Sequence, residues 1–165
     1  MVEASQTEEL TDPALSAREL CLLNAESKAL DVAVRHRDRL VLGADTVVTL
    51  EGRTFGKPET IAAARTMLET LCGKTHEVLT GVCLIHLGAD RMSRFVESTR
   101  VRFRPRSEVD LEAYLATVHT LDKAGAYAAQ EDEGRLIECL EGSRSNVIGL
   151  PVERVLAVLK ELASD

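Results

Sequence analysis

Apolar residues recur at helical spacing in two separate stretches of the first half of the chain. Asp12 is a favourable N-cap, and Pro13 after it is typical of a first helical position, so together they predict a helix that runs to about Arg35. A second helix is predicted from about Glu59 to Gly73, because glycine is favoured just past a helix end. Both stretches are amphipathic, and each helix is therefore expected to rest one face on a core.

Two further helices are predicted in the second half. Ser107 with Asp110 three residues later is a capping box with Asp in place of the usual Glu or Gln. The side chains expected to face inward from this helix are Val109, Leu111, Tyr114 and Leu115. Pro151 predicts the first turn of the final helix. Its expected apolar stripe consists of Val152, Val155, Leu156 and Leu159.

Strand patterns lie between these helices. Arg39–Leu50 is mostly apolar, which is typical of a strand covered on both faces. Strands are also predicted at about His76–Leu87 and Arg94–Arg104, joined by a turn at Gly88–Asp90, and a short one near Leu136–Leu140. Helices and strands alternate at first and hairpin-like strands follow, so the pattern predicts an α/β domain with a mixed sheet.

Arginines are concentrated in and after the third of these strands. They are Arg91, Arg94, Arg100, Arg102, Arg104 and Arg106, and the last four recur with a period of two. A phosphate-binding edge is one interpretation. The favoured one is a charged strand face that protects an edge strand from pairing with another chain.

Composition limits the possible functions. The chain has 165 residues, of which 45% are hydrophobic, enough for one domain whose core needs no disulfide or metal. The 20 basic and 27 acidic residues give a net charge of −7, which disfavours contact with nucleic-acid backbones and anionic lipid. No run approaches the roughly 20 apolar residues of a membrane span. We therefore expect a cytoplasmic protein whose partners include neither nucleic acid nor a membrane.

Asp45 is the residue that the packing pattern explains least. It interrupts the apolar run Leu40–Leu50, although aspartate is depleted in strands and an unpaired buried carboxylate is costly. One interpretation is an Asp at a strand end or bulge, satisfied by backbone N–H groups. The other is a general base or a carboxylate that faces a metal ion.

Three of the five lysines occupy unusual positions. Lys28 lies near the apolar face of the first predicted helix, where it either extends to solvent or points into a pocket. Lys57 lies in a Gly-Lys-Pro loop, which can bring its ammonium and the backbone close to a ligand. Lys123 begins an Ala/Gly-rich stretch in which Gly125 permits close backbone approach, and Gln130 at its end offers both a donor and an acceptor.

Several motifs, in order, resemble the Maf family of nucleoside triphosphate pyrophosphatases. They are Gly-Ala-Asp-Thr-Val-Val at 43–48, Gly-Lys-Pro at 56–58, Leu-Cys-Gly-Lys-Thr-His-Glu-Val at 71–78, Asp-Lys-Ala-Gly-Ala-Tyr-Ala-Ala-Gln at 122–130 and Glu-Gly-Ser-Arg-Ser-Asn-Val-Ile-Gly-Leu-Pro at 141–151. The resemblance extends from about residue 8 to the C-terminus. It implies a mixed, twisted sheet flanked by helices in two lobes around a central cleft, as in inosine triphosphatase-like folds, and a homodimer.

The resemblance also implies a reaction. Members of the family cleave a nucleoside triphosphate between its α and β phosphates with a divalent cation, Mg²⁺ or Mn²⁺. Asp45 is then expected to act as general base and to face the metal, with Lys28 and Lys57 as further catalytic residues. Lys123 is expected to bind the triphosphate, and Glu8 to lie near the metal and the phosphates.

Two residues resemble the branch of the family that acts on dTTP and UTP. Thr46 follows the expected base, and Gln130 stands in the late motif. Both are therefore expected to bind substrate, and the Gln130 amide suits the donor and acceptor edge of a pyrimidine.

One element of the family pattern is absent from this sequence. The family opens with a Ser-x-Ser-Pro-Arg-Arg loop that holds the triphosphate, whereas this chain begins Met1-Val-Glu-Ala-Ser5. A start assigned downstream, a trimmed chain or a natural loss would each account for this. The expectation is a single Maf-like domain over 1–165, N-terminally incomplete and with reduced turnover. The alternative is a catalytically impaired nucleotide-binding or regulatory protein.

Overall fold

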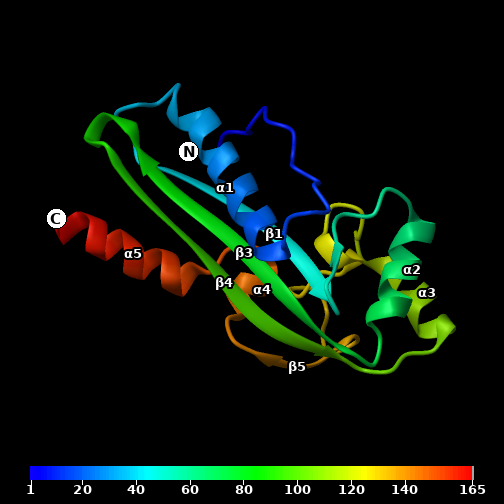
Figure 1. Cartoon of the computed structure of the whole chain (residues 1–165). Helices are drawn as coiled ribbons and strands as arrows, with labels where there is room; N and C mark the ends of the chain where they lie inside the picture. Colours follow the sequence, from blue (N-terminus) through cyan, green and yellow to red (C-terminus); the bar gives the residue numbers. More distant parts are fainter. Residues whose placement is uncertain (165) are drawn as a thin grey trace.

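The computed structural model describes residues 1–164, and its centre is a twisted sheet with helices on both faces (Figure 1). The strands of this range are β1 Val41–Leu50, β2 Arg53–Phe55, β3 Thr75–His86, β4 Arg91–Phe103 and β5 Ile137–Glu141, in the order β2-β1-β3-β4-β5. The predicted α/β class is confirmed. The sheet is antiparallel at every strand pair within residues 1–164, not mixed as expected. Short turns account for the direction of the β1–β2 and β3–β4 pairs.

The helices cover the two faces and one end of the sheet (Figure 1). They are α1 Ala17–Ala33, α2 Ile61–Leu71, α3 Glu108–Thr117, the short α4 Arg144–Ile148 and α5 Val152–Ser164, with 3₁₀ turns η1 Leu87–Ala89 and η2 Ala124–Ala126. Helix α1 packs on the face that carries Cys83 and Ile85, while Val155 of α5 packs on the opposite face against Val82 and Leu84. Helices α2 and α3 form a third cluster at one end of the sheet, together with η2.

The predicted start of the first helix is wrong by about one turn. Asp12 accepts a hydrogen bond from the Ala14 N–H and closes a turn, so Pro13 lies before the helix. Helix α1 begins after Ser16, whose hydroxyl accepts from the Glu19 N–H while the Glu19 carboxylate accepts from the Ser16 N–H. This reciprocal capping box pairs the backbone N–H groups of Ser16 and Glu19, which would otherwise lack a partner at the start of the helix.

The other predicted helix starts agree with the structure, and α4 was not predicted, but two apolar stripes are shifted. The Ser107–Asp110 capping box has both of its hydrogen bonds, and α5 follows Pro151. However, Val109 is 76% exposed, and Val152 and Leu156 are 42% and 51% exposed. The buried side of α5 runs through Val155, Val158, Leu159 and Leu162. These residues follow the spacing i, i+3, i+4, i+7, so only a narrow face of α5 contacts the sheet. Val152 and Leu156 flank this face and remain at the surface.

The arginines of β4 have a different role from the one favoured by the sequence. Arg100 and Arg102 lie where β4 pairs with β5, so this part of β4 is not an edge. Arg100 forms an ion pair with Glu141 at 3.1 Å, and Arg102 forms one with Glu138 at 2.8 Å. These cross-strand pairs join β4 to β5. No helix within residues 1–164 has both the length and the apolar character needed to cross a bilayer.

Candidate active site

Asp45 lies in the middle of β1, on the face that α1 covers. It stands opposite Gly81 of β3, and Gly43 precedes it by two residues on the same face. A Cβ at Gly43 would stand 2.4 Å from the Ala25 carbonyl oxygen, and one at Gly81 would stand 2.3 Å from that of Cys21. Both carbonyls belong to α1, so the two glycines allow this helix to lie directly on the sheet.

Side chains of α1 are thereby brought to the Asp45 carboxylate, which is 8% exposed. Lys28 Nζ donates to Asp45 Oδ1 at 2.6 Å, and Asn24 Nδ2 donates to Oδ2 at 3.4 Å. The same ammonium donates to Glu9 at 2.7 Å. Lys28 therefore points into the site and does not extend to solvent, and Asp45 is paired with side chains in mid-strand, not with backbone groups at a strand end.

The charges of this cluster affect one another. Burial raises the pKa of Asp45 above its usual value, although the hydrogen bond from Lys28 opposes the rise. Burial lowers the pKa of Lys28, but hydrogen bonds to Asp45 and Glu9 outweigh this, so the net effect is a raised pKa. The hydrogen bond from Lys28 lowers the pKa of Glu9. Lys28 thus stays an ammonium, beside a carboxylate that takes up a proton more readily than an exposed one.

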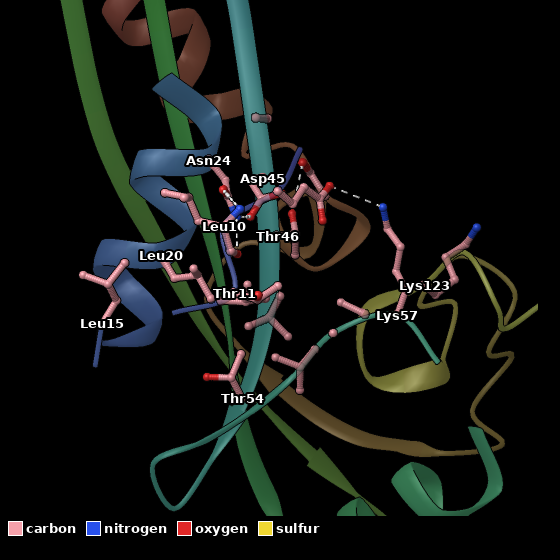
Figure 2. Close-up of a pocket in the computed structure, with 18 of the residues that line it drawn as sticks. Leu10, Thr11, Leu15, Leu20, Asn24, Asp45, Thr46, Thr54, Lys57 and Lys123 are labelled. Carbon is pink, nitrogen blue, oxygen red and sulfur yellow. Dashed lines mark hydrogen bonds and ion pairs between the residues drawn. The ribbon is translucent and has the colours of Figure 1, made fainter. Parts of the chain in front are cut away.

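A cavity of about 640 Å³ opens beside Asp45, a volume within the usual range of small-molecule sites. Helix α1 and the segment before it form one wall, and Figure 2 shows Lys57 and Lys123 on the side away from α1. Gly149, which follows α4, also lines the cavity. This cleft between two groups of elements has the general form that the sequence led us to expect.

The second wall is held together by the backbone. The Gly125 N–H donates to the Gly56 carbonyl at 3.1 Å, which joins η2 to the Gly-Lys-Pro loop. Gly125 has φ 71°, and a Cβ there would stand 3.0 Å from Val48 Cγ2, so the close approach expected at this glycine is confirmed. The Lys57 ammonium faces Glu9 at 3.7 Å, and Lys123 is paired with Asp122 at 2.7 Å.

The cavity brings together most of the residues expected from the sequence. Asp45, Thr46, Lys28, Lys57 and Lys123 all line it. Thr46 points to the opposite side of β1 from Asp45, as alternation along a strand requires. There its hydroxyl lies 2.9 Å from that of Thr80 and 3.4 Å from the Gly149 carbonyl.

Two expected residues lie outside the cavity. Glu8 is exposed, and Glu9 occupies the position beside the lysines instead. Adjacent side chains of a non-helical segment point in different directions, so only one of the two glutamates can face Lys28. Gln130 is also exposed, in a turn that follows the buried Ala128 and Ala129, and it does not line the cavity.

Sequence reasoning did not identify Asn24, which contacts Asp45 directly. It is 3% exposed and stands one helical turn before Lys28. A signal was present, since residues at i and i+4 share a helix face and a lysine on that face was already a candidate.

The fold and the site together define an α/β protein with a buried, lysine-paired carboxylate in a cleft that carries two further lysines. The chain belongs to the Maf family, because the family model described as "Maf-like protein" matches residues 1–162.

Several curated proteins are similar to this chain over most of its length. A dTTP/UTP pyrophosphatase of Halalkalibacterium halodurans is 47% identical over 136 residues, 82% of this chain and 70% of the relative. One from Akkermansia muciniphila is 45% identical over 157 residues, 94% of this chain and 82% of the relative. One from Bacillus cereus is 39% identical over 164 residues, 99% of this chain and 80% of the relative.

Proposed function

We propose that this protein is a nucleoside triphosphate pyrophosphatase that hydrolyses dTTP and UTP to the monophosphate and pyrophosphate. The observation that carries the proposal is the buried Asp45 carboxylate in a cavity whose walls hold Lys28, Lys57 and Lys123. The relatives named above carry the names of enzymes of this kind. These names favour catalysis over the alternative, a regulatory nucleotide-binding protein.

Asp45 is the general base of the proposed reaction. It accepts a proton from the attacking water, the bond between the α and β phosphates breaks, and pyrophosphate leaves. Lys28 holds Oδ1 of the carboxylate at 2.6 Å, so Oδ2 is the oxygen that faces fewer strong donors and accepts the proton. A carboxylate whose pKa is raised by burial is a better base than one in water.

Lys57 and Lys123 bind the phosphates. In the structure their ammonium groups face Glu9 and Asp122, so each lysine exchanges a carboxylate for phosphate oxygens when a triphosphate enters. Fixed ammonium groups stabilise the charge that develops on the leaving pyrophosphate. Local cations of this kind allow a protein with a net charge of −7 to bind a polyanion.

A divalent cation fits the donors present. Residues 1–164 contain no group of three or more His, Cys, Asp or Glu side chains that could hold a metal by itself. However, Mg²⁺ is usually held by one or two carboxylates together with the phosphates of the substrate. Asp45 and Glu9 share the ammonium of Lys28 and supply two such carboxylates. We assign Mg²⁺ or Mn²⁺ to them, with Glu9 in place of Glu8, and the cation would neutralise phosphate charge.

Replacement of Asp45 by Asn tests the proposal. We expect wild-type protein to release pyrophosphate from dTTP and UTP, and Asp45→Asn to lower kcat by about 10²-fold or more, because the amide cannot accept the proton. Asp38→Asn, at an exposed carboxylate outside the cavity, is the matched control and should leave kcat unchanged. Wild-type protein without pyrophosphate release would refute the function, and an active Asp45→Asn variant would refute the assigned base.

The resemblance to the family also implies a homodimer, which stays a prediction. Sedimentation equilibrium of the purified protein tests it, and a mass near the 18.0 kDa of one chain at all concentrations would contradict it.

A further inference from the structure

The segment before α1 lies along one face of that helix in antiparallel order. We call residues 3–10 the strap; Figure 1 shows it in dark blue beside α1. Moving along the strap, Glu3 contacts Arg35, the Gln6 N–H donates to Asp31, Glu9 contacts Lys28 and Leu10 contacts Asn24. Asn24, Lys28 and Asp31 are spaced i, i+4 and i+7 on one face of α1, and Arg35 lies just past the end of this helix. The strap is therefore fixed along α1 by a polar stripe.

Asn24 stands where this stripe meets the active site. Its Oδ1 accepts from the Leu10 N–H at 2.8 Å, and its Nδ2 donates to the Leu10 carbonyl at 3.3 Å and to Asp45 Oδ2 at 3.4 Å. The side chain is 3% exposed, and its two amide hydrogens and its oxygen are all used. Rotation of the amide by 180° would turn its oxygen toward the Asp45 carboxylate and its NH₂ toward the Leu10 N–H. Only one orientation is therefore compatible with both neighbours.

These contacts close a ring of interactions around the site. Asp45 is bound to Lys28, Lys28 to Glu9, Glu9 is joined by a peptide bond to Leu10, and Leu10 is bound through Asn24 back to Asp45. The two oxygens of Asp45 thus have separate donors one helical turn apart. Without Asn24, the carboxylate can rotate about the Lys28 contact, and the strap loses its most buried attachment.

We propose that Asn24 is a positioning residue of the active site, which holds the Asp45 carboxylate and the Glu9-bearing strap in one arrangement. The proposal rests on the proposed function, because it assigns a role in the same reaction. It predicts two separable effects of Asn24, one on the rate of turnover and one on the order of the strap.

Asn24→Leu keeps the size and burial of the side chain and removes all three hydrogen bonds. We expect kcat per folded molecule to fall by about 10- to 100-fold, because Asp45 Oδ2 loses its donor and the strap loses its hydrogen bonds at Leu10. Activity is measured well below the melting temperature of each variant, so a purely structural role would leave kcat per folded molecule unchanged. Leu30→Ala, at an exposed position of α1, is the control and should behave as wild type.

Hydrogen exchange separates the two effects without the use of activity. In Asn24→Leu, exchange at the Leu10 amide should rise at least tenfold, whereas exchange at the Leu15 amide, which donates to the Asp12 carbonyl, should not change. Asn24→Asp keeps an acceptor for the Leu10 N–H and loses the donor to Asp45. This variant should keep the Leu10 amide protected and still lose turnover.

Each result decides one part of the inference. Wild-type kcat in both folded variants would overturn the role toward Asp45, and an unchanged Leu10 amide in Asn24→Leu would overturn the role toward the strap. If Asn24→Leu fails to fold, Asn24→Asp, which has the same shape but a carboxyl group in place of the amide, carries the turnover test. Failure of the proposed function is a different result, since it would appear as a wild-type protein that releases no pyrophosphate.

Discussion

At the scale of single residues, Lys28 determines the electrostatics of the site. Its ammonium contacts Asp45 at 2.6 Å and Glu9 at 2.7 Å, so one cation separates two carboxylates that would otherwise repel each other. Removal of one partner from a buried ion pair leaves an uncompensated charge, which is more costly than absence of the whole pair. Variants of Lys28 should therefore change the chemistry of Asp45 as well as substrate binding.

Lys28→Met should lower kcat/KM by about 10²-fold and move the acidic limb of its pH profile to higher pH. The ammonium favours the ionised form of Asp45, so without it Asp45 holds its proton more tightly. At any given pH fewer molecules then carry the free base, and activity begins to fall at a higher pH. Profiles of kcat/KM for dTTP between pH 4 and 9 measure the shift.

Two matched variants accompany this comparison. Lys28→Arg keeps the charge and should give a smaller shift, and Lys74→Met removes a lysine from the exposed surface and should give none. An acidic limb at the same pH in Lys28→Met and wild type would contradict the coupling between Lys28 and Asp45.

At the scale of elements, the distance between α1 and the sheet decides whether the site forms. Gly43 and Gly81 stand where the helix backbone touches β1 and β3. Both donors to Asp45 come from this helix, so any displacement of α1 withdraws them together. The packing of α1 on the sheet therefore determines the geometry of the site.

Gly81→Ala should destabilise the protein by about 1–3 kcal/mol and lower kcat as well. The added Cβ would stand 2.3 Å from the Cys21 carbonyl oxygen, which is helix backbone and moves only with the whole of α1. Urea unfolding measures the free-energy change. Gly56→Ala, where a Cβ meets nothing within 4 Å, is the stability control and should change the free energy of unfolding by less than about 0.5 kcal/mol. Equal stabilities of the two variants would contradict this account of the helix–sheet contact.

At the scale of the whole molecule, the end of the sheet is closed by a cluster of rings. His76 of β3 packs edge-on against Phe103 and Tyr127, and its Nε2 lies 3.0 Å from the Tyr127 hydroxyl. Burial lowers the pKa of His76 to about 4. The folded protein therefore keeps this imidazole neutral, although the unfolded chain protonates it near its usual pKa of 6.5.

His76 should make the stability of the protein fall as the pH is lowered from about 7 towards 4. In this range the unfolded chain binds a proton that the folded protein does not, so acid favours unfolding, by about 2 kcal/mol at pH 5. His76→Phe keeps a ring in the cluster and removes the titration. The free energy of unfolding of this variant should therefore fall by about 2 kcal/mol less between pH 7 and pH 5 than that of wild type. A variant with the same pH dependence as wild type would show that other groups carry it.

Much of the fold could be predicted from local patterns. The starts of α2, α3 and α5 agree with the predictions because caps and prolines act within a few residues. The prediction of which residues face inward from α3 and α5 was less accurate, since the number of helix residues that are buried depends on the surface on which the helix packs. The start of α1 was misplaced because Ser16 and Glu19 form a stronger cap than Asp12 with Pro13.

The sequence by itself determined the α/β class, the family and the anomaly of Asp45, because each depends on residue types and their order along the chain. Only the tertiary structure decided that Glu9, not Glu8, joins Lys28, that Asn24 joins Asp45, and that Gln130 lies outside the cavity. These choices depend on which way a non-helical side chain points and on how closely a helix approaches a sheet. Both are set by contacts between segments far apart in the chain, which local patterns do not record.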